Sequence, residues 1–356
     1  MKKVIGFSLA LVVVAFGVIS MLSLNSCRQR VTTEFDTVYV QSPDWDDSLW
    51  VYRQSGTTED LIISEFLSPQ LGFVGGDGGT VLRSIDSGTT WARLATVPVS
   101  SESGTGVYGI HFFDATNGLA AGDGYNVWRT NDGGHTWSAI PISTSYNLRC
   151  MAFASPTVGI LGTADAYSTP PGSNGELWRT SDGGATWNRV LSISTGSFYH
   201  IRFLSATYGI ALGKFGTSYW TTDAGQTWNR SANDVPQYQI TRSTFLNAQT
   251  GFACGILQQT DGSADPTGGA LLRTDDAGQT WSTISHLQYP VQGIASGAAG
   301  ILTAAGYAGN VLESTDQGAT WPHATLGSAR WIDVNYATPQ RTIMIGANGH
   351  IATRDR

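Results

Sequence analysis

The strongest constraint on the fold is an eight-residue motif, Ser/Thr-x-Asp-x-Gly-x-Thr-Trp, which occurs six times in the 356 residues. Its aspartates follow one another after 46, 50, 41, 53 and 40 residues. Repeats of this length are typical of β-propellers, in which each repeat supplies one four-stranded blade. We expect the Asp and Trp residues of the motif to be structural, because every repeat carries them. They are Asp86, Asp132, Asp182, Asp223, Asp276 and Asp316, with Trp91, Trp137, Trp187, Trp228, Trp281 and Trp321.

Each motif has the composition of a β-hairpin turn. The Asp carboxylate can accept hydrogen bonds from backbone N–H groups of its own turn, Gly allows a positive φ, and Trp begins the return strand. An apolar strand precedes the motif, as at 81–83, and a Gly-rich loop precedes that strand, as at 75–79. Further upstream lies an innermost strand that ends in an aromatic residue. The aromatic residues are Phe66, Phe112, Phe153, Phe203 and Phe245.

A seventh repeat is split between the two ends of the chain. Residues 330–356 supply three strands and a truncated motif, Thr353-Arg354-Asp355, while Trp50-Val51-Tyr52-Arg53 reads like the missing Trp strand. The sequence therefore predicts an all-β fold, a single seven-bladed β-propeller of four-stranded blades over residues 45–356. The N-terminal strand completes the last blade and closes the ring. The alternatives are a ring that closes in some other way and a ring of six blades.

The motif resembles the Asp boxes (BNR repeats) of sialidases, xyloglucanases, sortilin-type receptors and the photosystem II assembly factor family. The last family is the most similar, because its repeat also joins a phrase like 66–73, a GDGG-type loop and an Arg before the box. These arginines are Arg83, Arg129, Arg179 and Arg273. The resemblance covers residues 45–356 and implies the propeller fold with a role as an assembly factor. Photosystem assembly itself would require a photosynthetic host, and the fold alone does not decide the activity.

The N-terminus has the features of an export signal. Two lysines precede an apolar run over residues 4–24, and Leu24-Asn25-Ser26-Cys27 resembles a bacterial lipobox. We expect residues 1–27 to be a lipoprotein signal peptide with Cys27 as the lipidation site, and residues 28–44 to be a tether. The chain would then be exported and lipid-anchored in the bacterial envelope, at the outer membrane. A transmembrane anchor is the alternative, because the run is long enough to span a bilayer.

Composition restricts the classes of partner. Past the leader, 18 basic residues face 27 acidic ones, a formal charge of about -9, so we expect no nucleic-acid partner. Cys150 and Cys254 remain after Cys27 and fall in non-adjacent blades, so we expect two buried free thiols rather than a disulfide. The histidines show no metal-ligand spacing and no cofactor motif occurs, so we expect neither a metal nor a cofactor. We also expect the protein to be a monomer.

Charged residues on the innermost strands leave a hydrolase alternative open. Glu65 and Asp333 could form a glycosidase pair, with arginines nearby at Arg149, Arg202, Arg242 and Arg330. We expect these charges instead to pair around the central channel, and the recurrent arginines before the boxes to stack or pair between blades. The alternative for the arginines before the boxes is that they form a basic ridge that recognises a ligand. The main hypothesis is a non-catalytic propeller that binds a protein partner or a glycan; the alternative is a sialidase-like glycoside hydrolase of the Asp-box class.

A candidate binding face lies opposite the Asp boxes. The loops between the second and third strands and the connections between blades share this face, and two of those loops are long, at 162–176 and 255–269. Acidic and aromatic residues would suit a cationic protein patch or a sugar. The candidate residues are Asp77, Asp123, Tyr125, Asp165, Tyr167, Lys214, Phe215, Asp261, Asp265 and Tyr307.

Overall fold

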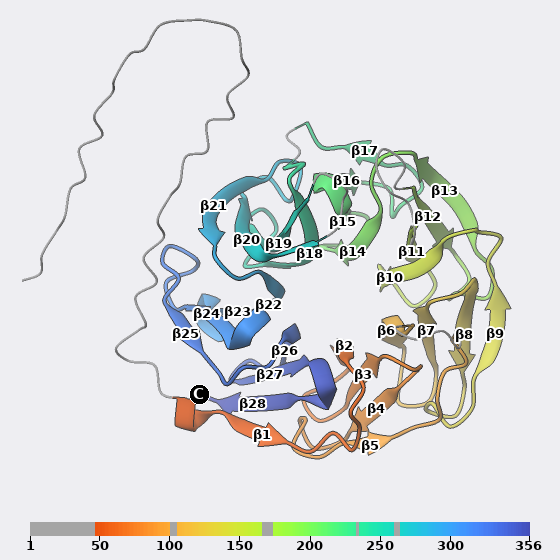
Figure 1. The fold of residues 1–356 in the computed structure, drawn as a ribbon. Helices are drawn as coiled ribbons and strands as arrows, with labels where there is room; N and C mark the ends of the chain where they lie inside the picture. The colour runs from red at the N-terminus through yellow and green to blue at the C-terminus, as the bar shows by residue number, and fades with distance from the viewer. Residues whose placement is uncertain (1–46, 100–104, 166–173, 233–234, 260–263) are drawn as a thin grey trace, which may run out of the picture. The chain divides into compact units, whose positions relative to one another are not determined.

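The computed structural model describes residues 47–99, 105–165, 174–232, 235–259 and 264–356. These residues form seven four-stranded antiparallel sheets arranged as blades around a central channel (Figure 1). The predicted seven-bladed all-β propeller is therefore confirmed. Five short 3-10 turns are the only helical segments in the described ranges, and none of them is long enough to cross a membrane.

The blades follow one another along the chain. Blade 1 contains β2 (Leu61–Phe66), β3 (Gly72–Gly76), β4 (Val81–Ser84) and β5 (Ala92–Arg93); blade 2 contains β6 (Val107–Phe112), β7 (Gly118–Gly122), β8 (Asn126–Thr130) and β9 (Ser138–Pro141). Blade 3 contains β10 (Asn147–Phe153), β11 (Gly159–Ala164), β12 (Gly175–Thr180) and β13 (Asn188–Ile193); blade 4 contains β14 (Phe198–Phe203), β15 (Gly209–Gly213), β16 (Ser218–Thr221) and β17 (Asn229–Arg230). Blade 5 contains β18 (Tyr238–Phe245), β19 (Gly251–Gln258), β20 (Ala264–Thr274) and β21 (Ser282–Leu287); blade 6 contains β22 (Val291–Ser296), β23 (Leu302–Gly306), β24 (Asn310–Ser314) and β25 (His323–Thr325).

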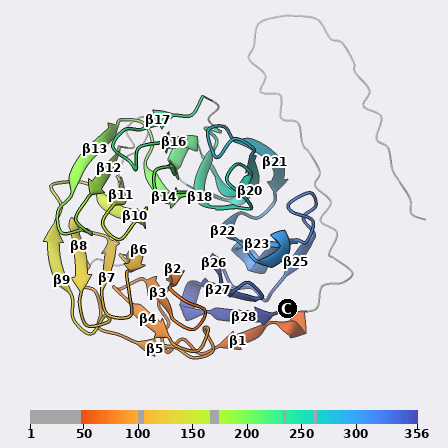
Figure 2. The same cartoon turned by 180° about the vertical axis from the view of Figure 1, so that it is seen from behind.

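Blade 7 is built from both ends of the chain. It contains β26 (Trp331–Thr338), β27 (Arg341–Gly346), β28 (Ile351–Asp355) and the N-terminal β1 (Val51–Arg53). Val51 pairs with Thr353 and Arg53 with Ile351, and Figure 2 shows β1 beside β28 from behind. The predicted closure by the N-terminal strand is confirmed.

The Asp carboxylate and the Ser/Thr hydroxyl make the same hydrogen bonds in all six boxes, whereas the Trp Nε1 donates to the box Gly only in blades 1, 3 and 6. In blade 1, Asp86 accepts bonds from Thr90 N (2.8 Å) and Thr90 Oγ1 (2.6 Å), and Ser84 Oγ accepts the Gly88 N–H at 2.8 Å. Gly88 has a φ of 78°, a value that favours glycine, and Trp91 Nε1 donates to the Gly88 carbonyl at 3.1 Å. Each box is thus a self-contained turn, as the sequence predicts.

Acid should destabilise the propeller through these boxes. Hydrogen bonds from the side chains of Thr136 and Thr320 lead the contacts that hold the pKa of Asp132 and of Asp316 at about 2. The unfolded-state pKa of Asp is about 3.9. A lowered folded-state pKa gives stability that is present above the unfolded value and is lost as pH falls through the folded one. We expect the melting temperature to fall between pH about 4 and about 2; a flat profile there would contradict this role.

A β-bulge recurs in each of the seven innermost strands. One residue near the start of each strand is skipped in the pairing with the second strand. Where the strand ends in Phe, the skipped residue lies four positions earlier, as Ile62 does relative to Phe66. The seven skipped residues are Ile62, Tyr108, Arg149, Tyr199, Thr241, Gln292 and Ile332. A bulge re-aims a side chain, and here it gives each blade one residue at the channel.

In blade 5, the structure differs from the long loop predicted at 255–269. β19 and β20 continue past the rest of the blade as a hairpin, with Gly255 opposite Ala270 and Ile256 opposite Gly269. The extension is stabilised by Leu257, which packs on the core of this blade. Most of the predicted loop in blade 5 is therefore strand, as are the two ends of 162–176 in blade 3.

Candidate binding site at the channel mouth

The seven bulge residues meet at one end of the channel. They line a cavity of about 320 Å³, together with Asp60, Asp77, Gln239, Arg242 and Arg330. Asp77 belongs to the loop between β3 and β4, and Asp60 and Arg330 belong to connections between blades. This end, which we call the mouth, is therefore on the predicted binding face. The sequence did not predict that these seven residues meet. Their position, four residues before the Phe that ends the strand, is nevertheless visible in the repeats that have this Phe.

Most charges at the mouth are paired. Arg330 Nη2 lies 2.6 Å from Asp60 Oδ2, and Arg149 Nη2 lies 3.0 Å from Asp123 Oδ1. The Arg149 guanidinium also lies over the ring of Tyr108, 4.0 Å from its centroid, a cation–π contact. Asp123 further accepts the Gly106 N–H at 2.9 Å and is only 6% exposed. Asp123 is one of the predicted binding-face residues; in the structure it is buried, and its carboxylate holds Arg149.

Asp77 has a different environment. Burial, followed by the carboxylates of Asp60 and Glu59, raises the pKa of Asp77 to about 6. Ionising Asp77 places negative charge beside two carboxylates, and a cation from outside would relieve that repulsion. The mouth therefore offers a half-buried carboxylate to a basic group.

The remaining predicted face residues are spread around the mouth. Tyr125 is 51% exposed, and Tyr307 lies under the Arg330 guanidinium at 5.7 Å. The Lys214 ammonium lies 5.5 Å from the Phe215 ring, in the short turn of blade 4. Asp165 and Asp265 lie in blades 3 and 5, where Asp265 accepts bonds from the Thr267 backbone and hydroxyl. Tyr167, Asp261 and the lipidation site Cys27 fall outside the described residues.

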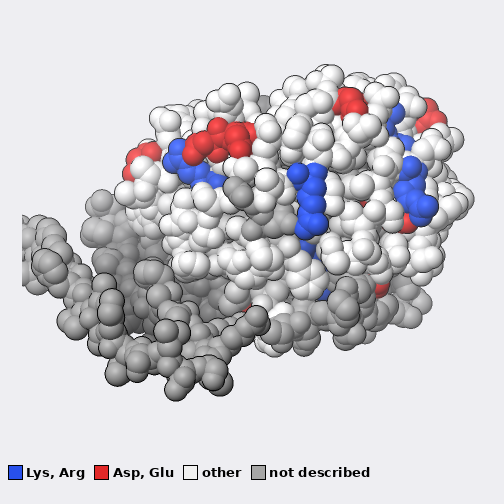
Figure 3. Space-filling view, turned by 90° about the horizontal axis from the view of Figure 1, so that it is seen from above, with Lys and Arg blue, Asp and Glu red and all other residues white. Residues whose placement is uncertain are grey.

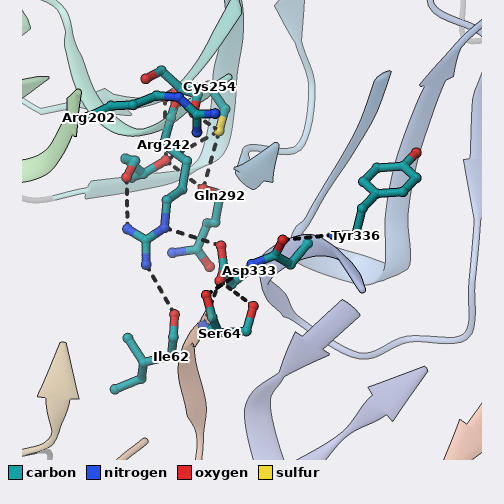
Figure 4. A network of polar contacts seen from close by, with 11 residues as sticks. Ile62, Ser64, Arg202, Arg242, Cys254, Gln292, Asp333 and Tyr336 are labelled. Atoms are coloured by element: carbon teal, nitrogen blue, oxygen red, sulfur yellow. Dashed lines mark hydrogen bonds and ion pairs between the residues drawn. The ribbon is translucent and has the colours of Figure 1, made fainter. Parts of the chain in front are cut away.

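The channel below the mouth is crossed by Arg242. From blade 5, its Nε lies 3.2 Å from Asp333 Oδ1 in blade 7, and its Nη2 donates to the Ile62 carbonyl of blade 1 at 3.2 Å (Figure 4). Asp333 Oδ2 accepts both the N–H and the hydroxyl of Ser64 at 2.8 Å. Arg242 thus joins non-adjacent blades and lines both the mouth and an inner cavity of about 300 Å³.

The two carboxylates of the hydrolase alternative are both engaged. Asp333 is bound by Arg242 and Ser64, while Glu65 contacts His111 Nδ1 at 2.7 Å and accepts the Phe112 N–H at 2.9 Å. A general acid or nucleophile needs a carboxylate oxygen directed at its substrate. The observed pairing agrees with the expectation that these charges neutralise one another around the channel.

The recurrent arginines before the boxes contact neighbouring turns. Arg129 donates to the Gly183 carbonyl at 2.6 Å and Arg179 to the Ala224 carbonyl at 2.9 Å, each in the box of the next blade. Arg273 instead pairs with Asp275 at 2.8 Å. In at least two of the four positions the Arg therefore ties successive blades together, which is the structural role expected.

Cysteine and metal chemistry are limited in the described part of the chain. Cys150 and Cys254 are free and buried, and burial raises the pKa of both thiols to about 12. No group of three or more His, Cys, Asp or Glu residues there could hold a metal ion.

Charged side chains stand in separate groups on the side seen in Figure 3, with uncharged surface between them.

Seven blades with six Asp boxes define the chain as an Asp-box (BNR) propeller. More narrowly, the family model described as photosynthesis system II assembly factor YCF48 matches residues 42–353, so the chain belongs to that family. The family resemblance stated from the sequence is therefore confirmed. A comparison with curated proteins gave no match.

Solved structures share the fold at low identity. A structure described as "YCF48 bound to D1 peptide" is 19% identical, with a TM-score of 0.66, and the match covers 91% of this chain and 99% of that one. YCF48 from Cyanidioschyzon merolae is 19% identical, with a TM-score of 0.64 and coverage of 86% and 98%. The GH74 xyloglucanase from Xanthomonas campestris is 16% identical, with a TM-score of 0.66, and this chain covers 54% of it.

Proposed function

We propose that this chain is a lipid-anchored, non-catalytic assembly factor that binds a protein partner at the cell envelope through the mouth of its channel. The observation that carries the proposal is the family: a structure of YCF48 is described as bound to a D1 peptide, so a propeller of this family accepts a protein segment. Fold alone would not assign this role.

The geometry of the mouth supports a protein segment with basic groups. Asp77 is half-buried beside Asp60 and Glu59, and a positively charged side chain would find the Asp77 carboxylate at the edge of a cavity of about 320 Å³. The exposed ring of Tyr125 offers apolar contact on the same face. Tyrosines next to charged groups are common anchors in protein interfaces. The sequence also allowed a glycan as the ligand of this face, and a glycan could stack on the same ring.

Photo-crosslinking in cells tests the face. A benzophenone side chain placed at Tyr125 should give crosslinked adducts with an envelope protein, and Asp77→Lys should remove most of them because it repels a basic partner. The matched control places the same group at Leu67, which is 37% exposed and lies in a loop at the opposite, Asp-box face. Equal adducts at both positions, or adducts that persist in Asp77→Lys, would rule out the mouth; an adduct with carbohydrate instead of peptide would identify the glycan alternative.

The anchor is tested separately at Cys27. Cys27→Ala should remove acylation and release the protein from membranes into the soluble fraction, while the melting temperature of the propeller stays unchanged. Cys254→Ala is the matched control, because this buried thiol lies in blade 5 and should not affect membrane binding. A Cys27→Ala protein that still sediments with membranes after a high-salt wash would mean that a transmembrane segment, not a lipid, holds it.

A further inference from the structure

The inner cavity contains a guanidinium that pairs with no carboxylate of the described residues. Arg202 lines this cavity of about 300 Å³ from β14. Its hydrogen bond among the described residues runs from Nη1 to the Ser243 carbonyl, at a long 3.4 Å. Burial lowers the pKa of Arg202, and no acidic group contributes to that shift. Arg202 is partly buried, and a partly buried cation without an anion is unfavourable, so this side chain is suited to receive one.

His200 is a second nitrogen-bearing side chain in this cavity. It precedes Arg202 by two residues on β14 and lines the same cavity. Burial, followed by the charges of Arg242 and Arg202, holds the pKa of His200 well below its ordinary value. Its Nε2 is enclosed and has no hydrogen-bond partner among the described residues. His200 therefore adds to the cavity a ring nitrogen without a partner among the described residues, on the same strand as Arg202.

The acidic residues of the cavity are already bound elsewhere. Asp333 accepts bonds from Arg242 and from Ser64, and Glu65 is held by His111 and the Phe112 N–H. Neither carboxylate supplies the charge that Arg202 lacks. From this arrangement we propose that the inner cavity binds a small oxyanion, a carboxylate or a phosphate, with Arg202 as its principal ligand and Arg242 and His200 beside it.

The shape of the donor set fits this class of ligand. A guanidinium is planar and can donate two parallel hydrogen bonds to the oxygens of a carboxylate or phosphate. The cavity volume of about 300 Å³ is at the lower end of ligand pockets, which suits a small anion. The site differs from the acidic mouth in its principal ligand, because Arg202 and His200 line only the inner cavity, although Arg242, Tyr108 and Tyr199 line both. It therefore does not depend on the proposed protein partner.

Calorimetric titration of the full-length chain with succinate and with inorganic phosphate, at constant ionic strength in chloride, tests the site. The wild type should show saturable binding with a Kd of about 1 mM or below for at least one anion. Arg202→Gln should weaken that binding about tenfold or more. Arg93→Gln, which removes an exposed arginine on β5, is the matched control and should bind as the wild type does. The tighter of the two anions identifies the carboxylate or the phosphate as the preferred chemistry.

A loss of anion binding can be distinguished from a loss of protein stability. If Arg202→Gln does not fold, Arg202→Lys keeps the charge without the paired donors and should bind measurably more weakly than the wild type. No saturable binding of either anion to the wild type would overturn the proposal, as would equal affinity in the wild type and in the folded Arg202 variants. Crosslinking at the mouth is a separate readout, so the failure of either proposal leaves the other standing.

Discussion

Trp50→Ala should destabilise the whole propeller by about 3–5 kcal/mol, the usual cost of truncating a buried Trp. Trp50 is 5% exposed and packs with Trp331, Met344 and Ala352 in the core of blade 7. It immediately precedes β1, the strand that closes the ring, so its loss weakens the pairing of β1 with β28. Urea unfolding followed by tryptophan fluorescence measures the effect, which should appear as one cooperative transition at lower urea.

Leu49→Ala is the matched control. Leu49 is 48% exposed and lies next to Trp50, so its truncation should change the free energy of unfolding by less than about 0.5 kcal/mol. A Trp50→Ala protein with an unchanged unfolding midpoint would mean that β1 does not hold the ring together.

The fold was predictable because it depends on local chemistry that repeats. Each Asp box satisfies its own hydrogen bonds, so its residues identify the turn without knowledge of the rest of the chain. Five of the seven innermost strands end in Phe, whose ring covers the first Gly of the second strand; a Cβ at Gly72 would lie 2.4 Å from the Phe66 ring. Six complete copies of the motif also made the incomplete seventh readable at both termini.

The site was less predictable because it depends on which blades face one another. The bulge that directs Tyr108 and Arg149 into the mouth leaves no mark in composition, only in register relative to the terminal Phe. The role of Asp123 follows from Arg149 on the next blade, and the contact of Arg242 with Ile62 joins residues 180 positions apart. The hairpin of blade 5 was expected as a loop because its Gly residues and Pro266 are typical of turns.

Asp333→Ala should be the most destabilising change among the polar residues of the channel. The Arg242–Asp333 pair is largely buried, with side-chain exposures of 15% and 6%. Removing one partner of a buried ion pair typically costs about 3–5 kcal/mol, because the other charge remains without compensation. Two donors of Ser64 would also lose their acceptor. We expect a large fall in the unfolding midpoint in urea.

A double variant distinguishes this ring-locking role from catalysis. Arg242→Met combined with Asp333→Leu removes both charges together, so it should be clearly more stable than Asp333→Ala alone. A catalytic carboxylate would behave differently, because active-site residues are commonly held at a cost in stability. In that case the wild type would hydrolyse aryl glycosides or sialosides. Asp333→Ala would lose this activity, and its unfolding midpoint would be unchanged or higher. We expect the first pattern, since Asp333 gives both of its oxygens to Arg242 and Ser64 and presents neither to a substrate.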